Sequence, residues 1–193
     1  MNRRSLVLLL ILALICAACG GGSSGSSGKS PSDDRSGKGD PTSPPDTTPP
    51  PDTTPPPPDT GMSAAEVAMA LAVLDYVNAE RANAGLSPVA IHSEGSDVAW
   101  RHSVDMDERD FFSHTNPDGD GPGQRIAAAG IANAGWGENI AYGYGSPESV
   151  MTAWMNSSGH RANILNANWT HVGIGVHSAP GGPWWTQVFL RIR

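Results

Sequence analysis

The fold class is decided by a stretch near the end of the chain, Thr170-His-Val-Gly-Ile-Gly-Val-His-Ser178. Its valines and isoleucine recur at every second position with glycines between them, a pattern that predicts a half-buried strand. A Gly181-Gly182-Pro183 turn follows, and Trp184 to Ile192 has the composition of a second strand. Two strands this close in sequence are expected to pair as an antiparallel hairpin.

Helices are expected to precede this hairpin. The segment Ser63-Ala-Ala-Glu66 has the pattern of a capping box, and an apolar helix face continues from it until Gly85. Periodicity and capping signals predict further helices at 93–109, at 124–129, from Ser146 onward and around 160–165, with another strand around 138–142. Because most helices come before the strands, the sequence predicts an α+β fold with helices packed on an antiparallel sheet.

The 193 residues carry a formal net charge of −7. The composition is very uneven along the chain, because residues from Met62 onward include neither lysine nor cysteine. This acidic balance argues against nucleic-acid binding, which requires clustered lysine and arginine. Residues 62–193 are long enough to bury one core without disulfides. The sequence therefore predicts a hydrophobic head, a linker and one domain.

The head has the features of a secretory signal peptide. Arg3 and Arg4 precede an apolar run, Leu6 to Ile15, that is too short to span a bilayer comfortably. The following Cys16-Ala-Ala-Cys19-Gly20 resembles a bacterial lipoprotein processing site, although Cys16 stands where leucine is usual. We therefore expect removal of residues 1–18 and lipidation of Cys19, which would anchor the protein outside the cytoplasm, with the outer membrane or cell surface favoured. Ordinary signal cleavage with a free Cys19 is the alternative.

Residues 19–61 are predicted to form a disordered linker rich in glycine, serine and proline. Eleven of the 17 prolines lie between Pro31 and Pro58, a tract that contains two Pro-Pro-Asp-Thr-Thr units and the run Pro55 to Pro58. Such a tract favours the extended polyproline II conformation and, at ~3 Å per residue, would hold the domain roughly 60 to 90 Å from the lipid. A proline-rich tract can also bind an aromatic-lined groove, but a spacer is the preferred interpretation.

Six histidines raise the question of a metal site. His114 lies in an irregular stretch where a loop can direct its side chain, and His160 lies near a helix N-terminus, which favours the neutral, metal-binding imidazole. Glu138 is predicted on an apolar strand face, where a carboxylate needs a partner. Two histidines and one glutamate would suit a zinc ion with an open coordination position. Spacing alone does not bring these residues together, so local sequence favours structural histidines.

The remaining histidines have structural interpretations. His102 lies on the apolar face of its helix and is expected to be a hydrogen-bonded core residue. His171 and His177 lie on the strand face opposite the valines, exposed or covered by a helix, and His92 precedes a helix cap without an evident partner. The segment Asn116 to Gly121 resembles half of a calcium-binding loop, but the twelfth position is not glutamate, so a polar turn is preferred.

Several motifs, in order along the domain, together resemble a known family. They are Asn78-Ala-Glu-Arg81, His102-Ser-Val-Asp-Met106, Phe111-Phe-Ser-His-Thr-Asn-Pro-Asp-Gly119, Gly137-Glu-Asn-Ile-Ala141 and Trp154-Met-Asn-Ser-Ser-Gly-His-Arg-Ala-Asn-Ile-Leu165. With the closing strands, they are similar to the bacterial branch of the CAP superfamily (cysteine-rich secretory protein, antigen 5 and pathogenesis-related 1), also called SCP-like. The resemblance covers nearly all of residues 62–193.

This resemblance implies an α-β-α sandwich with a central antiparallel sheet and a cleft that holds two histidines and two glutamates. Carried over by motif, the histidines are His114 and His160 and the first glutamate is Glu138. The second glutamate is absent, because Asn156 and Ser157 occupy the region where it normally lies. The resemblance implies no single reaction, since family members are variously described as lipid carriers, peptide or signalling ligands and proteases.

The leading hypothesis is a lipid-anchored binding module whose cleft of His114, Glu138 and His160 holds a divalent metal, zinc being favoured, or a small-molecule, lipid or peptide ligand. A metal-dependent hydrolase of the cell envelope is the alternative, with Glu138 as the candidate ligand or general base. Catalysis is disfavoured because no base or nucleophile is identifiable once His114, Glu138 and His160 are used as metal ligands. A third hypothesis is a structural module that binds another protein.

Overall fold

The predicted hairpin lies at the centre of the fold in the computed structural model, which describes residues 60–192. Strands β3 (His171–His177) and β4 (Trp184–Leu190) pair antiparallel, and β2 (Trp136–Tyr142) pairs antiparallel with the other side of β4. A two-residue strand, β1 (Ala90–Ile91), pairs parallel with β3 and was not predicted. The sheet order is β1-β3-β4-β2, so β2 is an edge strand.

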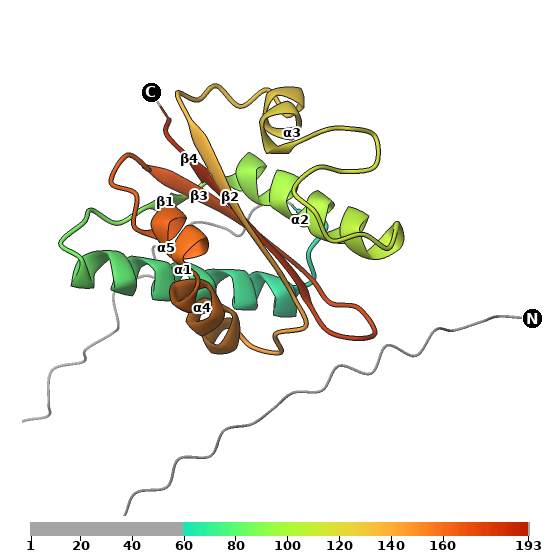
Figure 1. The fold of residues 1–193 in the computed structure, drawn as a ribbon, viewed down its shortest axis with the longest axis horizontal. Helices are drawn as coiled ribbons and strands as arrows, with labels where there is room; N and C mark the ends of the chain where they lie inside the picture. Colours follow the sequence, from blue (N-terminus) through green and yellow to red (C-terminus); the bar gives the residue numbers. More distant parts are fainter. Residues whose placement is uncertain (1–59, 193) are drawn as a thin grey trace, which may run out of the picture. The chain divides into compact units, whose positions relative to one another are not determined.

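Helices cover both faces of this sheet (Figure 1). On one side lie α1 (Ala64–Asn83), α4 (Pro147–Asn156) and α5 (Ser158–Ile164). On the other side lie α2 (Ser93–Glu108) and the short α3 (Pro122–Ala128). The predicted α+β class and the α-β-α layering are therefore confirmed. No helix among the described residues is long and apolar enough to cross a membrane.

Strand β3 is buried on both faces, so the expectation of a half-buried strand was wrong. Its valines and isoleucine pack into the core formed with α1 and α4. Its glycines face α2, and a Cβ at Gly173 or Gly175 would overlap the backbone of that helix. Adjacent Trp184 and Trp185 are both buried because they point to opposite sheet faces, Trp184 towards Met106 of α2 and Trp185 into the α1 side.

The helix ends follow local capping chemistry. Ser63 and Glu66 form the predicted capping box at the start of α1, and Ser146 caps α4 with Pro147 at its first position. No partner was predicted for His92, but this residue caps α2: its Nδ1 atom accepts a hydrogen bond from the Gly95 N–H. The predicted signal peptide, Cys19 and nearly all of the linker lie outside the described residues.

Candidate functional site

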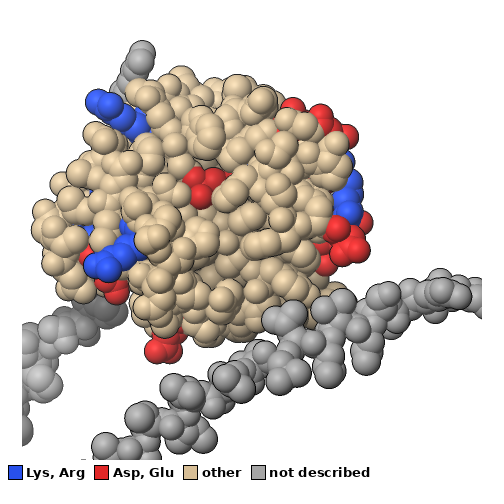
Figure 2. All heavy atoms as spheres, viewed as in Figure 1, with Lys and Arg blue, Asp and Glu red and all other residues tan. Residues whose placement is uncertain are grey.

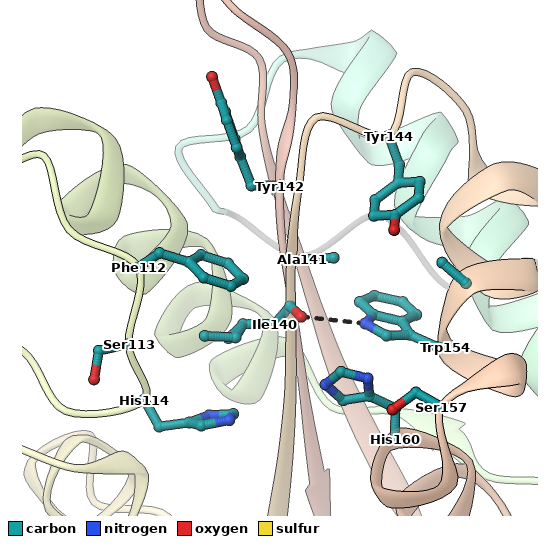
Figure 3. Close-up of a pocket in the computed structure, with 11 residues that line it drawn as sticks. Phe112, Ser113, His114, Ile140, Ala141, Tyr142, Tyr144, Trp154, Ser157 and His160 are labelled. Carbon is teal, nitrogen blue, oxygen red and sulfur yellow. Dashed lines mark hydrogen bonds between the residues drawn. The ribbon is translucent and has the colours of Figure 1, made fainter. Parts of the chain in front are cut away.

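A pocket of about 710 Å³ lies over the edge strand β2, between loops and helices from the two layers (Figure 3). The loop after α2 contributes Phe112 and His114 from one side, and α4 and α5 contribute Trp154 and His160 from the other. The full lining is Phe112, Ser113, His114, Ile140, Ala141, Tyr142, Tyr144, Ala153, Trp154, Ser157 and His160. Its size lies within the range of small-molecule sites, and among residues 60–192 no Asp, Glu, Lys or Arg lines it.

The exposed surface around this strand is poor in charge. Figure 2 shows a face on which most side chains are uncharged; acidic and basic groups lie towards its edges, and acidic atoms are also visible near its centre. Phe112, Tyr142 and Tyr144 are large aromatic residues that remain exposed at the pocket. The Tyr142 ring packs on Trp184 with 4.1 Å between ring centroids, so the aromatic rim continues into the protein interior.

Helices α4 and α5 are fixed to the open edge of β2 by side chains that bond its backbone. The Trp154 Nε1–H donates to the carbonyl oxygen of Ile140 at 3.3 Å, and the Asn163 amide donates to that of Glu138 at 3.0 Å. These two bonds satisfy edge carbonyl groups that would otherwise be unpaired. They also bring His160, one turn before Asn163, to the pocket.

His114 and Glu138 are in direct contact. The His114 Nδ1 atom lies 2.8 Å from Glu138 Oε1, and the Glu138 side chain is only 1% exposed. The second carboxylate oxygen, Oε2, accepts a hydrogen bond from Arg125 Nη2 at 2.7 Å. Glu138 lies on the same strand face as Ile140 and Tyr142, as predicted, and the partner that its burial requires consists of a histidine and an arginine.

The loop that carries His114 is held by its own polar groups. Asn116 Oδ1 accepts hydrogen bonds from the N–H groups of Asp118 and Asp120, which agrees with the predicted polar turn. Arg125 Nη1 donates to the carbonyl oxygens of His114 and Asp120, both at 2.9 Å. Arg125 thus fixes the backbone of the loop as well as the Glu138 carboxylate.

His160 faces His114 across the pocket (Figure 3). Burial lowers the pKa of His160 below its ordinary value of 6.5, and the nearby His114 lowers it further. The carbonyl oxygen of His160 accepts a hydrogen bond from the Asn139 amide at 3.2 Å. His160 is therefore predominantly neutral near pH 7, as the helix position suggested.

Of the three predicted metal ligands, His114 and His160 line this pocket, and Glu138 is bonded to His114. Both carboxylate oxygens of Glu138 are already bonded, to His114 and Arg125. Within residues 60–192, no group of three or more His, Cys, Asp or Glu side chains is placed to hold a metal ion. Zinc binding by His114, His160 and Glu138 therefore stays a prediction.

The other histidines have structural roles. His102 is 1% exposed and bonds the Ser113 carbonyl oxygen through Nε2 at 3.0 Å; burial lowers its pKa. The predicted hydrogen-bonded core histidine is thus confirmed. His177 contacts Asp107 of α2 at 3.2 Å, and the His171 ring packs edge-on against His92.

Arg125 is a residue of the site that was not predicted from the sequence. The available signal was the predicted burial of Glu138, since a buried carboxylate is paired with a cation or coordinates a metal. The aromatic rim was also missed, because tyrosines in a strand and a loop carry no pattern that distinguishes a pocket from an ordinary surface.

Comparison with known proteins identifies related chains. Residues 74–189 match the family model described as CAP, the cysteine-rich secretory protein family. The uncharacterized protein YkwD of Bacillus subtilis (strain 168) is 43% identical over 118 residues, 61% of this chain and 45% of that protein. Among solved structures, an extracellular protein containing an SCP domain from Bacillus anthracis str. Ames is 32% identical with a TM-score of 0.62, over 65% of this chain and 41% of that one.

A more distant structure has the same fold. An outer surface protein from Borrelia burgdorferi is 20% identical with a TM-score of 0.59, over 63% of this chain and 90% of that one. In contrast, the present chain spans less than half of the length of YkwD and of the Bacillus anthracis protein. The similarity to those two proteins therefore concerns the domain and not their whole chains.

Proposed function

This chain belongs to the CAP, or cysteine-rich secretory protein, family, and we propose that it acts outside the cytoplasm as a binding module for a small, mainly apolar ligand. The observation that carries this proposal is the 710 Å³ pocket, whose walls are mainly aromatic and aliphatic and which two histidines also line. Concave apolar sites with a few convergent polar groups are the usual form of small-molecule sites.

The apolar walls would supply most of the binding free energy. A ligand placed against Phe112, Ile140 and Trp154 would lose contact with water at about 25 cal/mol for each Å² of apolar surface buried. His114 and His160 would orient its polar group by hydrogen bonds. Because no carboxylate, ammonium or guanidinium lines the cavity, the pocket is suited to an uncharged ligand.

The proposed location has two supports. The Bacillus anthracis relative is described as an extracellular protein. The head of this chain has the features of a signal peptide, and the predicted lipid on Cys19 would keep the domain near a membrane while the proline-rich linker acts as a spacer.

Titration with Nile red, a neutral apolar dye, tests the binding function. Saturable binding is expected for the wild-type protein, and Ala153→Phe, which places a ring in the pocket from α4, should weaken it at least tenfold. Ala132→Phe, at an exposed position outside the pocket, is the matched control and should bind like wild type. Absence of saturable binding, or equal binding by both variants, would exclude the pocket as the site.

A metal-independent hydrolase is the second candidate function, and the His114–Glu138 pair is the observation that favours it. A carboxylate bonded to Nδ1 orients an imidazole for general-base catalysis, as in the hydrolase triads. Such an enzyme should hydrolyse members of a pool of esters and peptides, with activity abolished by His114→Ala.

Calorimetric zinc titration of wild type, His114→Ala and His160→Ala tests the predicted metal site. Zinc binding that neither substitution changes would exclude that site.

A further inference from the structure

We propose that Arg125 is a positioning residue of the pocket: through Glu138 it holds His114 with the proton on Nδ1, so that Nε2 accepts a hydrogen bond from a hydroxyl or amide N–H group of the ligand. The ligand class in this proposal rests on the proposed binding function. The tautomer of His114 does not, and it is measured without any ligand.

The contacts of Arg125 support this role. One guanidinium nitrogen, Nη2, donates to Glu138 Oε2 at 2.7 Å, and the other, Nη1, donates to the carbonyl oxygens of His114 and Asp120 at 2.9 Å each. The Arg125 side chain is 12% exposed and does not line the cavity. Its charge therefore compensates the buried carboxylate from behind the pocket wall.

The position of Arg125 is itself rigid. Its neighbour Ile126 is 1% exposed and packs in the core between α2 and β4. At the N-terminus of the same short helix, Gln124 Oε1 accepts a hydrogen bond from the Gly121 N–H at 3.2 Å. The guanidinium is thus fixed relative to both the loop and the sheet, as a positioning residue requires.

The tautomer of His114 follows from the same geometry. A carboxylate only accepts hydrogen bonds, so the 2.8 Å contact between Glu138 Oε1 and His114 Nδ1 requires the proton on Nδ1. In a neutral imidazole, Nε2 is then an acceptor. His114 is 49% exposed and lines the cavity, so this acceptor is available to a ligand. The negative charge of a ligand carboxylate would face the lone pair of His114 Nε2 with no positive charge to compensate it. A ligand hydroxyl group would instead donate a hydrogen bond to that lone pair.

Nitrogen-15 NMR of histidine-labelled protein near pH 7.5 tests the tautomer. Wild type should have His114 protonated on Nδ1, and Arg125→Lys, which keeps a cation beside Glu138, should preserve that state. Arg125→Gln removes the bonds that hold the His114 loop and the carboxylate, so His114 should separate from Glu138 and the population should shift towards the Nε2-protonated form. Arg101→Gln, which removes an exposed arginine paired with Asp97, is the control and should leave His114 unchanged. An unchanged His114 tautomer in folded Arg125→Gln would overturn the proposal.

A second variant keeps the test decisive if Arg125→Gln does not fold. In Glu138→Gln, Arg125 should keep its hydrogen bond to the side-chain oxygen of residue 138, which leaves the amide NH₂ group facing His114. Because that NH₂ group donates, His114 Nδ1 must accept the hydrogen bond, and the imidazole proton moves to Nε2. His114 remaining protonated on Nδ1 in this variant would contradict the proposed chain of contacts.

The ligand class is tested with decanol and decanoate, which share one alkyl chain. Calorimetric titration of wild type should give decanol the tighter binding by roughly tenfold, the equivalent of one good hydrogen bond. Glu138→Gln, with Nε2 as donor, should reverse this order. If neither compound binds, the proposed function fails while the tautomer result stands on its own. If both bind equally well to wild type, the assigned ligand class is wrong.

Discussion

At the scale of single residues, Glu66 connects the start of the domain to the central hairpin. Its Oε2 atom accepts a hydrogen bond from the Ser63 N–H in the α1 capping box, and its Oε1 atom accepts one from the Ser178 N–H at 2.6 Å. Burial acts to raise the pKa of Glu66, but the Ser178 and Ser63 N–H groups and the Ser63 hydroxyl together lower it below 4.5. The ionised form of Glu66 therefore stabilises the fold.

Glu66→Gln should reduce stability in a pH-dependent manner. A carboxyl group whose pKa is lower in the folded state contributes stability above its unfolded pKa and loses it as the pH falls through the folded value. The variant should thus lose about 1 to 2 kcal/mol of unfolding free energy at about pH 7 and a smaller amount at about pH 3. Urea denaturation at both pH values measures this, with Asp75→Asn on the exposed face of α1 as control. A pH-independent difference would contradict the role given to the Glu66 charge.

Some residues of the site could be predicted from the sequence and others could not. His114, Glu138 and His160 were named from motifs similar to those of a family, because no local rule brings residues that far apart in sequence to one pocket. Arg125 was not named, since its role depends on the distance between α3 and β2, which short-range patterns do not encode. The contacts of Glu138 with His114 and Arg125 were likewise not predicted, and zinc binding at these residues stays a prediction.

At the scale of elements, β3 shows what the alternation of apolar residues and glycines in a sequence can and cannot predict. Alternation predicted the strand, and its short separation from the next strand predicted the pairing with β4; both predictions are confirmed. It did not predict that the glycine face is also buried, because a glycine face can be exposed or can admit the close approach of another backbone. Here α2 approaches so closely that side chains at Gly173 and Gly175 have no space.

Gly173→Ala should therefore destabilise the protein strongly, since the added methyl group would overlap the backbone of Gly95 and separate α2 from the sheet. We expect a loss of about 3 kcal/mol or more in the free energy of unfolding. Gly145→Ala is the matched control, because no atom lies within 4 Å of a Cβ at that position. Thermal or urea denaturation compares the three proteins, and similar stability for both variants would refute this account of the α2–sheet contact.

At the scale of the whole molecule, the predicted anchor lies outside the described residues and is open to a direct test. Wild-type protein expressed in a bacterium should sediment with membranes and incorporate labelled palmitate, because Cys19 is the predicted lipidation site. Cys19→Ser should lose both properties, whereas Cys16→Ser should retain them because Cys16 belongs to the segment removed. Membrane retention of Cys19→Ser at the wild-type level would contradict the predicted anchor.

The central claim for the whole molecule is that the pocket over β2 binds a small apolar ligand with its polar group at the histidines. The most direct measurement is NMR of the protein with decanol, recording intermolecular nuclear Overhauser effects. The account predicts contacts from the alkyl chain to Phe112 and Trp154, contacts from the carbinol end to His114 and His160, and the loss of all of them in Ala153→Phe. Contacts confined to other surfaces, or none under saturating decanol, would contradict it.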